Sequence, residues 1–418
     1  MRVAVIAEWY PSPADPVHGI WAHRQAVAAT AAGVEIEVLA LRRPVPPRAV
    51  LARVRGGDRH ALRVWFDGAR RDLRPWSLEG IPVTPVPWLG PPRPLSYGSW
   101  GHWMAPPLAR ALSRLAARWP FDLLHVHTLA PAGHAASGWA RRHRVPLILS
   151  AHGPDLTDVP TRSAVGARAV RAALTRAQLV LANSGWARRR CLELGAAPER
   201  VRVLHLGADL PARTGGGESP TARSGPLRLI TIAHLQARKH HHTVLEAIAA
   251  IPVDRRPSWT VIGDGEQRSA LTARAEALGL GAHVTFTGQL DHAHALARLA
   301  DADLFVMPGV QEPFGVAFIE AMAAGVPAVG GRGEGGPEDI AAAGPGMLLV
   351  TPGVPAELSE LIERLDANRN ALGELGTAAR ATVAAHFTWT RCGEATLAAY
   401  AGVLAAPRPP RVSWGVRG

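Results

Sequence analysis

The stretch MPGVQEPFGVAFIEAMAAGVPAVGG, residues 307–331, contains the end of an apolar strand, a polar loop, an apolar helix and a second apolar strand. The apolar run that leads into Met307 stops at Pro and Gly, which is typical of a buried strand. Glu312 lies in the loop, and the helix begins near Phe314 and Gly315. A strand, a helix and a further strand in this order predict one unit of a parallel sheet.

The same alternation continues outward from this stretch in both directions. Apolar strands are expected in the first half at RVAVIAE, VEIEVLAL, LLHVH, PLILSAHG, LVLANS and RVRVLHLG, and in the second half at LRLITIAHL, WTVIGDG, HVTFTGQL, ADLFVMPG, PAVGG and GMLLVTP. Repeated strand–helix units predict doubly wound parallel sheets, which bind ligands at the carboxyl ends of their strands. We therefore predict an α/β fold of two Rossmann-like domains that face each other across a cleft.

A segment without hydrophobic periodicity separates the two halves. It is GADLPARTGGGESPTARSGP, which is rich in Gly, Pro and Ser, as linkers are. The predicted division is residues 1–206 for the first domain, 207–226 for the linker, 227–390 for the second domain, 391–405 for a helix that crosses back to brace the first domain, and 406–418 for a loose tail.

The bulk composition is that of a globular protein. The chain has 418 residues, of which 47% are hydrophobic, and this length suits two cores. The only two cysteines, Cys191 and Cys392, are far apart, so no disulfide framework or zinc spacing is expected and a reducing compartment fits. No apolar run reaches the roughly 20 residues of a membrane span. We expect a cytoplasmic protein, with peripheral contact at the inner membrane face as an option.

The positive charge is concentrated in the first half of the chain. The first 205 residues contain 28 arginines and 13 acidic residues, whereas the remainder contains 18 basic and 21 acidic residues. This asymmetry fits an anionic acceptor, an anionic membrane face or nucleic acid, and it equally fits a solvated, arginine-rich surface. A nucleic-acid binder is disfavoured because the sequence has no recognition-helix or RNA-binding motif.

Lys239 is the only lysine, beside 45 arginines. A compact ammonium is suited to binding phosphate as a point charge, which makes Lys239 a candidate phosphate ligand. Three histidines follow it at 240–242, but adjacent residues of a helix do not converge on one side, so we expect no metal site.

Glu320 is surrounded by apolar residues in its predicted helix. A buried carboxylate needs hydrogen-bond donors, and two ribose hydroxyls would serve. The start of the same helix offers free N–H groups and a positive dipole end, which suit a diphosphate.

These features resemble the signature of the retaining glycosyltransferases of GT-B fold in glycosyltransferase family four. The resemblance lies in Glu312, Phe314, Gly315 and Glu320, and in the following GEGGPEDI, and it extends over nearly the whole chain. It implies that the second domain binds a nucleotide-diphosphate sugar as co-substrate, with no cofactor and no metal. It also implies transfer to an acceptor hydroxyl with retention of anomeric configuration.

The resemblance also assigns residues. His234 stands where the family usually has Arg, so Arg238 is a candidate substitute; the catalytic candidates are His152 and Glu312, and the acceptor candidates are His127 and Asp155. The implied donor-binding set is Gly19, His234, Arg238, Lys239, Gly263, Leu290, Phe314, Gly315, Val316 and Glu320. For His127 a structural role is the favoured alternative.

The acceptor, which could be anionic or lipid-linked, stays open, as does the oligomeric state. Synthesis of cell-surface polysaccharide or glycolipid and synthesis of secondary-metabolite glycosides are both compatible with the resemblance. So are a GT-B protein that binds sugar nucleotides without transfer, and one with epimerase or phosphorylase chemistry.

Residues 75–107 do not follow the strand–helix scheme. They contain Trp76, Trp88, Trp100 and Trp103 among many prolines. We expect a loop whose aromatic side chains pack beneath it, with a flap that contacts acceptor or membrane as the alternative.

Overall fold

The computed structural model describes residues 1–92, 96–211 and 225–406. The first domain is built on an eight-stranded sheet in the order β3-β4-β2-β1-β5-β6-β7-β8. All neighbouring pairs in it are parallel except β3 and β4. Its strands are β1 (Arg2–Ala7), β2 (Glu35–Arg42), β3 (Trp76–Leu78), β4 (Ile81–Pro87), β5 (Leu123–His127), β6 (Leu147–Ala151), β7 (Leu179–Ala182) and β8 (Val201–Val203).

Both faces of this sheet are covered, which explains why its strands are apolar throughout. Along β1, Ala4 and Ile6 face one core, whereas Val3 and Val5 face the other. The helices of the domain are α1 (Ile20–Ala31), α2 (Arg48–Arg55), α3 (Arg59–Asp72), α4 (Trp100–Arg118), α5 (His134–His143), α6 (Pro154–Arg162), α7 (Ala164–Arg176) and α8 (Gly185–Glu193).

The second domain is built on a six-stranded, wholly parallel sheet in the order β11-β10-β9-β12-β13-β14. Its strands are β9 (Arg228–Ile232), β10 (Ser258–Ile262), β11 (Val284–Gly288), β12 (Leu304–Met307), β13 (Ala328–Gly331) and β14 (Met347–Val350). Its helices are α9 (His241–Ala250), α10 (Arg268–Ala277), α11 (His292–Ala297), α12 (Val316–Ala323), α13 (Gly335–Ala343), α14 (Pro355–Ala367) and α15 (Arg369–His386).

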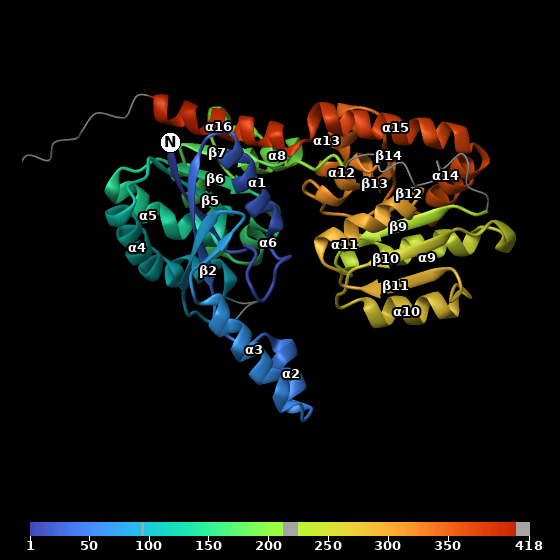
Figure 1. Ribbon diagram of the computed structural model, residues 1–418, viewed down its shortest axis with the longest axis horizontal. Coiled ribbons are helices and arrows are strands. Elements are labelled where there is room, and N and C mark those ends of the chain that lie inside the picture. The colour runs from blue at the N-terminus through green and yellow to red at the C-terminus, as the bar shows by residue number, and fades with distance from the viewer. Residues whose placement is uncertain (93–95, 212–224, 407–418) are drawn as a thin grey trace, which may run out of the picture.

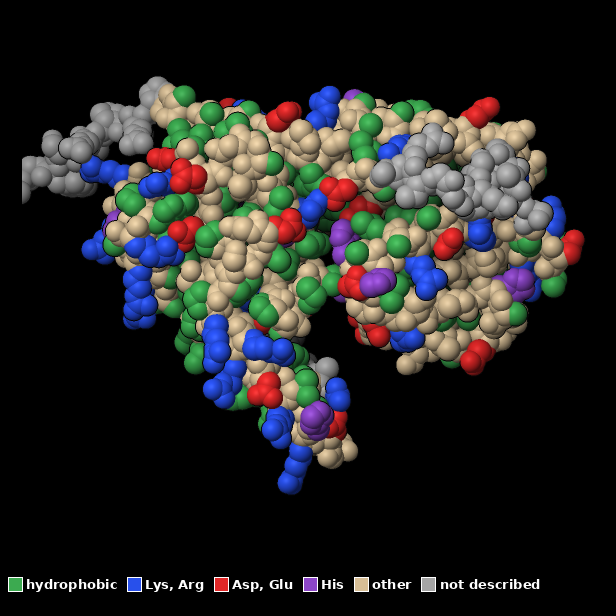
Figure 2. All heavy atoms as spheres, in the orientation of Figure 1, with side chains coloured by type: hydrophobic (Ala, Val, Ile, Leu, Met, Phe, Trp, Pro, Cys, Tyr) green, Lys and Arg blue, Asp and Glu red, His purple; other side chains and the backbone are tan. Residues whose placement is uncertain are grey.

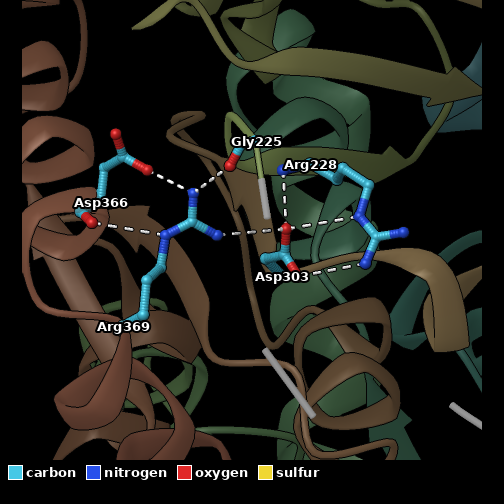
Figure 3. A network of polar contacts seen from close by, with 5 residues as sticks. All are labelled: Gly225, Arg228, Asp303, Asp366 and Arg369. Atoms are coloured by element: carbon cyan, nitrogen blue, oxygen red, sulfur yellow. Dashed lines mark hydrogen bonds and ion pairs between the residues drawn. The ribbon is translucent and has the colours of Figure 1, made fainter. Parts of the chain in front are cut away.

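A buried carboxylate joins the starts of two central strands of the second domain (Figure 3). Asp303, 1% exposed, accepts the backbone N–H of Arg228 at 2.9 Å and lies 3.9 Å from a guanidinium nitrogen of Arg369. Arg369 also donates to the carbonyl of Gly225 at 2.8 Å. Because Arg228 is the first residue of β9 and Asp303 directly precedes β12, the network stabilises the amino edge of the sheet, opposite the carboxyl edge.

The crossing helix predicted near the C-terminus is confirmed. Helix α16 (Trp389–Ala405) follows α15 and lies along the first domain, against α1 (Figure 1). The amide of Gln25 donates to the hydroxyl of Thr396 at 3.1 Å, and the side chain of Tyr400 is fully buried. The predicted tail lies outside the described residues from 407 onward, as does most of the linker, 212–224.

The two chain crossings between the domains lie side by side. Ala208, in the first crossing, donates its N–H to the carbonyl of Phe387 at 2.8 Å. Arg24 of α1 forms an ion pair with Asp209, and its guanidinium lies 5.6 Å from the ring centre of Trp389. These contacts define the hinge region of the molecule.

The expectation of a loop over residues 75–107 is wrong for most of that stretch. It forms β3 and β4 and then enters α4 at Trp100. The predicted packing of aromatic side chains holds for Trp88 and Trp100, which are 3% and 5% exposed and have ring centres 4.9 Å apart. Trp103 is half exposed. Two helices that the sequence analysis did not assign, α2 and α3, form an arm that extends away from the first domain (Figure 1).

Candidate functional site

Lys239 and Glu312 meet at the carboxyl edge of the second sheet. Lys239 ends a short 3₁₀ turn after β9, and its Nζ forms a direct ion pair with a Glu312 carboxylate oxygen. The side chains are 10% and 11% exposed. Burial lowers the pKa of Lys239 and Glu312 opposes that shift. The site therefore holds a nearly buried ammonium–carboxylate pair. Removing either side chain would leave the other as an unpaired, nearly buried charge.

A close backbone approach brings the two loops together. Val310, after β12, donates its N–H to the carbonyl of Arg238 at 2.7 Å. A Cβ on Gly309 would lie 2.7 Å from that same oxygen and 2.9 Å from the Cα of Lys239. Only glycine allows this contact, so Gly309 places Glu312 within reach of Lys239.

Helix α12 begins directly after Glu312. Its N-cap, Gly315, has a φ of 85°, and no side chain caps the helix, so its first N–H groups and its dipole point to the carboxyl edge. Val316 is the first helical residue and is partly buried. Phe314 departs from the expected donor contact, because its ring is 2% exposed and packs 5.5 Å from the His205 ring. Its side chain anchors the loop, and only its backbone is available to a ligand.

Glu320 lies one turn further along α12 and is bound by a residue that the sequence analysis missed. Its Oε1 is 2.7 Å from Nε2 of His292, at the start of α11. The Glu320 side chain is 13% exposed, and its hydrogen bond raises the pKa of His292. In the described structure His292 is thus hydrogen-bonded to one of the two Glu320 oxygens that were expected to bind ribose hydroxyls.

The remaining expected donor ligands lie on neighbouring loops of the same edge. His234 is exposed after β9, and Arg238 lies with Nη1 3.9 Å from Glu312. Gly263 follows β10, where a Cβ would lie 2.0 Å from the carbonyl oxygen of Ala233. Leu290 follows β11 and is partly buried against the core that contains α12. Strand order therefore gathers all of these loops around the start of α12.

His152 is the expected catalytic residue of the first domain and lies just after β6. Its Nε2 is 2.9 Å from Nδ1 of His127, and the two rings are nearly coplanar, at 13°. His127 is 3% exposed, and burial lowers the pKa of both imidazoles. His127 is thus placed to orient His152, which is only partly buried.

Asp155 also differs from its expected acceptor role. It is 3% exposed, and its two oxygens accept backbone N–H groups from Leu129 at 2.9 Å, His152 at 3.1 Å and Gly153 at 2.8 Å. A carboxylate occupied in this way fixes the loops after β5 and β6. The aspartate positions His152 and leaves no oxygen facing the cleft.

The loops that contain His152 and Glu312 touch across the two domains. A Cβ on Gly153, next to His152, would lie 2.4 Å from Cγ of Pro313, next to Glu312. The contact joins the first-domain histidine loop to the second-domain glutamate loop. Figure 2 shows the hollow between the two halves of the molecule.

A carboxylate of α13 ties the domains together near this contact. Asp339 accepts the backbone N–H of Gly185, at the start of α8, and lies 3.2 Å from Nε2 of His205. Burial raises the pKa of Asp339, but these hydrogen bonds outweigh it and lower the pKa overall. The segment GEGGPEDI, which the sequence analysis matched only as a motif, thus supplies a domain contact.

A groove of about 750 Å³ lies on the first domain between the arm and the carboxyl edge of its sheet. Gly19, with a φ of 82°, opens α1 beside it, and a Cβ there would lie 2.3 Å from the carbonyl of Trp9. The groove combines aromatic and apolar side chains with both basic and acidic ones, among them Trp9, Trp65, Arg42, Arg71, Glu8, Asp15 and Asp72. It is large enough for a small-molecule acceptor.

Within 1–92, 96–211 and 225–406, no three His, Cys, Asp or Glu side chains gather as a metal site would require. No helix in the same ranges is long and apolar enough to cross a membrane.

Sequence reasoning missed His292, His205 and the groove because their partners are distant in sequence. His292 is 28 residues from Glu320, and His205 is 134 residues from Asp339. The sequence did offer one signal for the two histidines: His205 follows β8 and His292 follows β11, and loops after parallel strands converge at one edge of the sheet.

Two Rossmann-like domains that meet at the carboxyl edges of their sheets, with a helix crossing back, define the GT-B class. Residues 19–211 match the family described as Glycosyltransferase Family 4, and residues 218–382 match the family described as Glycosyl transferases group 1. A 2-deoxystreptamine glucosyltransferase of Streptomyces kanamyceticus is 30% identical over 337 residues, covering 73% of this chain and 84% of the relative. The chain belongs to this family of group 1, family four glycosyltransferases.

Solved structures agree on the fold. Sucrose-phosphate synthase of Thermosynechococcus elongatus superimposes with a TM-score of 0.76 at 19% identity, covering 97% of this chain and 100% of that one. Anabaena Alr3699/HepE in complex with UDP-glucose superimposes with a TM-score of 0.69 at 19% identity, covering 96% and 100%. The protein is therefore a glycosyltransferase of GT-B fold.

Proposed function

We propose that the protein transfers a sugar from a nucleotide-diphosphate sugar to an acceptor hydroxyl, with retention of anomeric configuration and without a metal ion. The observation that carries the proposal is the buried Lys239–Glu312 pair beside the uncapped start of α12, in contact with the His152 loop. The UDP-glucose complex of a structural neighbour makes UDP-sugars the first donors to test.

In the proposed mechanism the second domain stabilises the leaving diphosphate. Negative charge builds on the diphosphate as the bond to the sugar breaks. Lys239 supplies a point charge, the start of α12 supplies N–H groups, and Arg238 lies close enough to assist. These three sources of positive potential perform the task that a divalent ion performs elsewhere, which is why we propose metal independence.

Glu312 and His152 act on the sugar. Glu312 accepts hydrogen bonds from sugar hydroxyls and orients the ring, and His152, held by His127, does so from the opposite domain. The acceptor hydroxyl attacks from the face that the phosphate leaves, and the departing phosphate oxygen takes the hydroxyl proton. The contact of Gly153 with Pro313 excludes water from this point and limits hydrolysis of the donor.

We propose that the acceptor enters from the groove beneath the arm. The groove opens at the carboxyl edge of the first sheet, and its side chains offer both stacking surfaces and guanidinium groups. An acceptor with an apolar part and polar groups suits this lining, which mixes aromatic surfaces with arginines and carboxylates. Both lipid-linked and soluble acceptors of that kind fit it.

The proposed reaction is tested by turnover of radiolabelled nucleotide sugars in the presence of EDTA. UDP-sugars should be consumed, with label recovered in a new product when a soluble or lipid-linked acceptor is supplied. Recovery of an epimerised sugar nucleotide would contradict the proposal, and so would binding without any product. Loss of activity in EDTA with restoration by a divalent ion would contradict metal independence.

Donor affinity is expected to rise with pH through the titration range of His292. Below its raised pKa, His292 is protonated and hydrogen-bonded to Glu320. A ribose that binds both Glu320 oxygens must displace this cation. His292 then loses the partner that raised its pKa, so donor binding releases a proton. Above that pKa the neutral imidazole competes less. Calorimetry of UDP binding between about pH 6 and 8 measures the slope.

Two variants separate this effect from other titrations. His292→Asn should flatten the curve, and Glu320→Ala should weaken UDP binding at every pH by about 2 kcal/mol. If affinity instead rises as pH falls, Glu320 does not exchange His292 for the ribose, and this prediction is wrong.

A further inference from the structure

The arm carries an unusual combination of exposed side chains. Residues 48–74 contain eight arginines and three aspartates. Four of the ten exposed large apolar side chains in the described structure also lie there: Leu51, Leu62, Val64 and Phe66, at 40%, 40%, 54% and 54%. Figure 2 shows the basic side chains gathered over this projection.

Helix α3 has two distinct faces. Its inner face packs on the first domain through Ala61 and Gly68, both buried, and through Asp72, which accepts the Ser12 hydroxyl at 2.9 Å. The inner face therefore lies against the first domain and lines the groove described above.

The outer face of α3 combines apolar and basic side chains at helical spacing. Leu62 and Phe66 are four residues apart, and Arg59, Arg63 and Arg70 lie on the same side of the helix. All five are exposed, and within the described residues none of these three guanidinium groups forms an ion pair. Apolar residues flanked by unpaired arginines are typical of a helix that lies in a membrane interface.

We propose that the α2–α3 arm docks the protein onto an anionic lipid bilayer, with Leu62 and Phe66 inserted at the interface and the arginines on lipid phosphates. Charge selects this partner over a second copy of the chain, because two such arms would repel each other. The apolar pair selects it over duplex nucleic acid, whose non-specific binding depends on phosphate contacts and makes no use of an exposed leucine beside the phenylalanine. The groove lies on the opposite, inner side of α3, so docking through the outer face leaves it open.

Co-sedimentation with vesicles tests the proposal and needs no donor, so it is independent of the transfer reaction. The protein should sediment with phosphatidylglycerol–phosphatidylcholine vesicles at low salt, less at high salt, and not with phosphatidylcholine alone. Arg63→Glu with Arg70→Glu should lower the partition coefficient at least roughly thirtyfold, since each arginine contributes about fivefold. Leu62→Ser with Phe66→Ser should also reduce it strongly.

The matched control is Arg141→Glu with Arg142→Glu, two exposed arginines at the end of α5 in the same domain. It should bind like the wild type apart from a small uniform loss. Equal loss in this control would show that net charge alone drives binding and would overturn the proposal. The proposal would also be overturned if the variant with Leu62→Ser and Phe66→Ser bound vesicles like the wild type, or if the wild-type protein did not sediment with anionic vesicles at low salt.

A labelling experiment reports insertion directly. Both native cysteines are buried, so Phe66→Cys can be labelled selectively with a polarity-sensitive fluorophore, with Val253→Cys in the second domain as control. Anionic vesicles should shift the emission to the blue at position 66 only. A shift that appears without vesicles as protein concentration rises would identify a second copy as the occupant and contradict the proposal.

Discussion

Replacing Lys239 with Ala is expected to lower kcat/KM by about 10²- to 10³-fold, the loss seen when one preorganised donor to a developing anion is removed. Lys239 is the only lysine, it is nearly buried, and Nζ already lies on the carboxylate beside the proposed diphosphate position. Its removal takes the main positive charge from the leaving group. Single-turnover kinetics with a UDP-sugar measure the effect on the chemical step.

Two further variants show whether the activity depends on a compact positive charge at this position. Lys239→Arg should restore only part of the rate, because a planar guanidinium cannot occupy the position of a compact ammonium. Arg238→Ala should have a smaller effect, since its side chain is 38% exposed and lies 3.9 Å from the same carboxylate. Full activity of Lys239→Ala in a folded protein would mean that the diphosphate lies elsewhere.

Replacing Glu312 with Gln is expected to reduce kcat by about 10²-fold while UDP affinity stays unchanged or rises. The amide keeps the shape of the side chain but loses the charge that holds sugar hydroxyls. It also frees the ammonium of Lys239 for the diphosphate. Opposite effects on transfer and on UDP binding are the signature of a group that acts on the sugar, and calorimetry beside steady-state kinetics reports both.

The control for this substitution is Glu363→Gln. Glu363 forms a surface ion pair with Arg255 at 2.7 Å, and such pairs contribute little to stability. It should leave both measurements unchanged. A parallel loss of UDP binding and transfer in Glu312→Gln, with a lowered melting temperature, would instead indicate that the buried pair only stabilises the fold.

Much of the architecture could be predicted from the sequence because its elements follow local rules. Apolar strands that alternate with helices gave both parallel sheets, and the Pro and Gly after Met307 placed the loop that contains Glu312. The start of α12 at Gly315 followed from the same pattern. Parallel sheets collect ligand-binding loops at one edge, so residues after successive strands were expected together, as Lys239 and Glu312 are.

Features that depend on long-range contacts could not be predicted in this way. Phe314 fits a ligand-binding motif, yet its ring is buried against His205, a residue of the other domain. Asp155 follows a strand like a ligand, yet three backbone N–H groups occupy it. The outer face of α3 mixes Leu62 and Phe66 with arginines, and this pattern lacks the apolar stripe that identifies a core-packed helix.

The most direct test of the central claim is the anomeric configuration of the transferred sugar. Proton NMR of the product from a UDP-α-glucose or UDP-α-galactose donor, formed in EDTA, gives the coupling constant between H1 and H2 of the transferred sugar, which differs between the α and β anomers. The account predicts an α-configured product, because the acceptor attacks from the face that the phosphate leaves, beside Lys239 and Glu312. A β-configured product would contradict it, since inversion requires the acceptor to attack from the face opposite the departing phosphate.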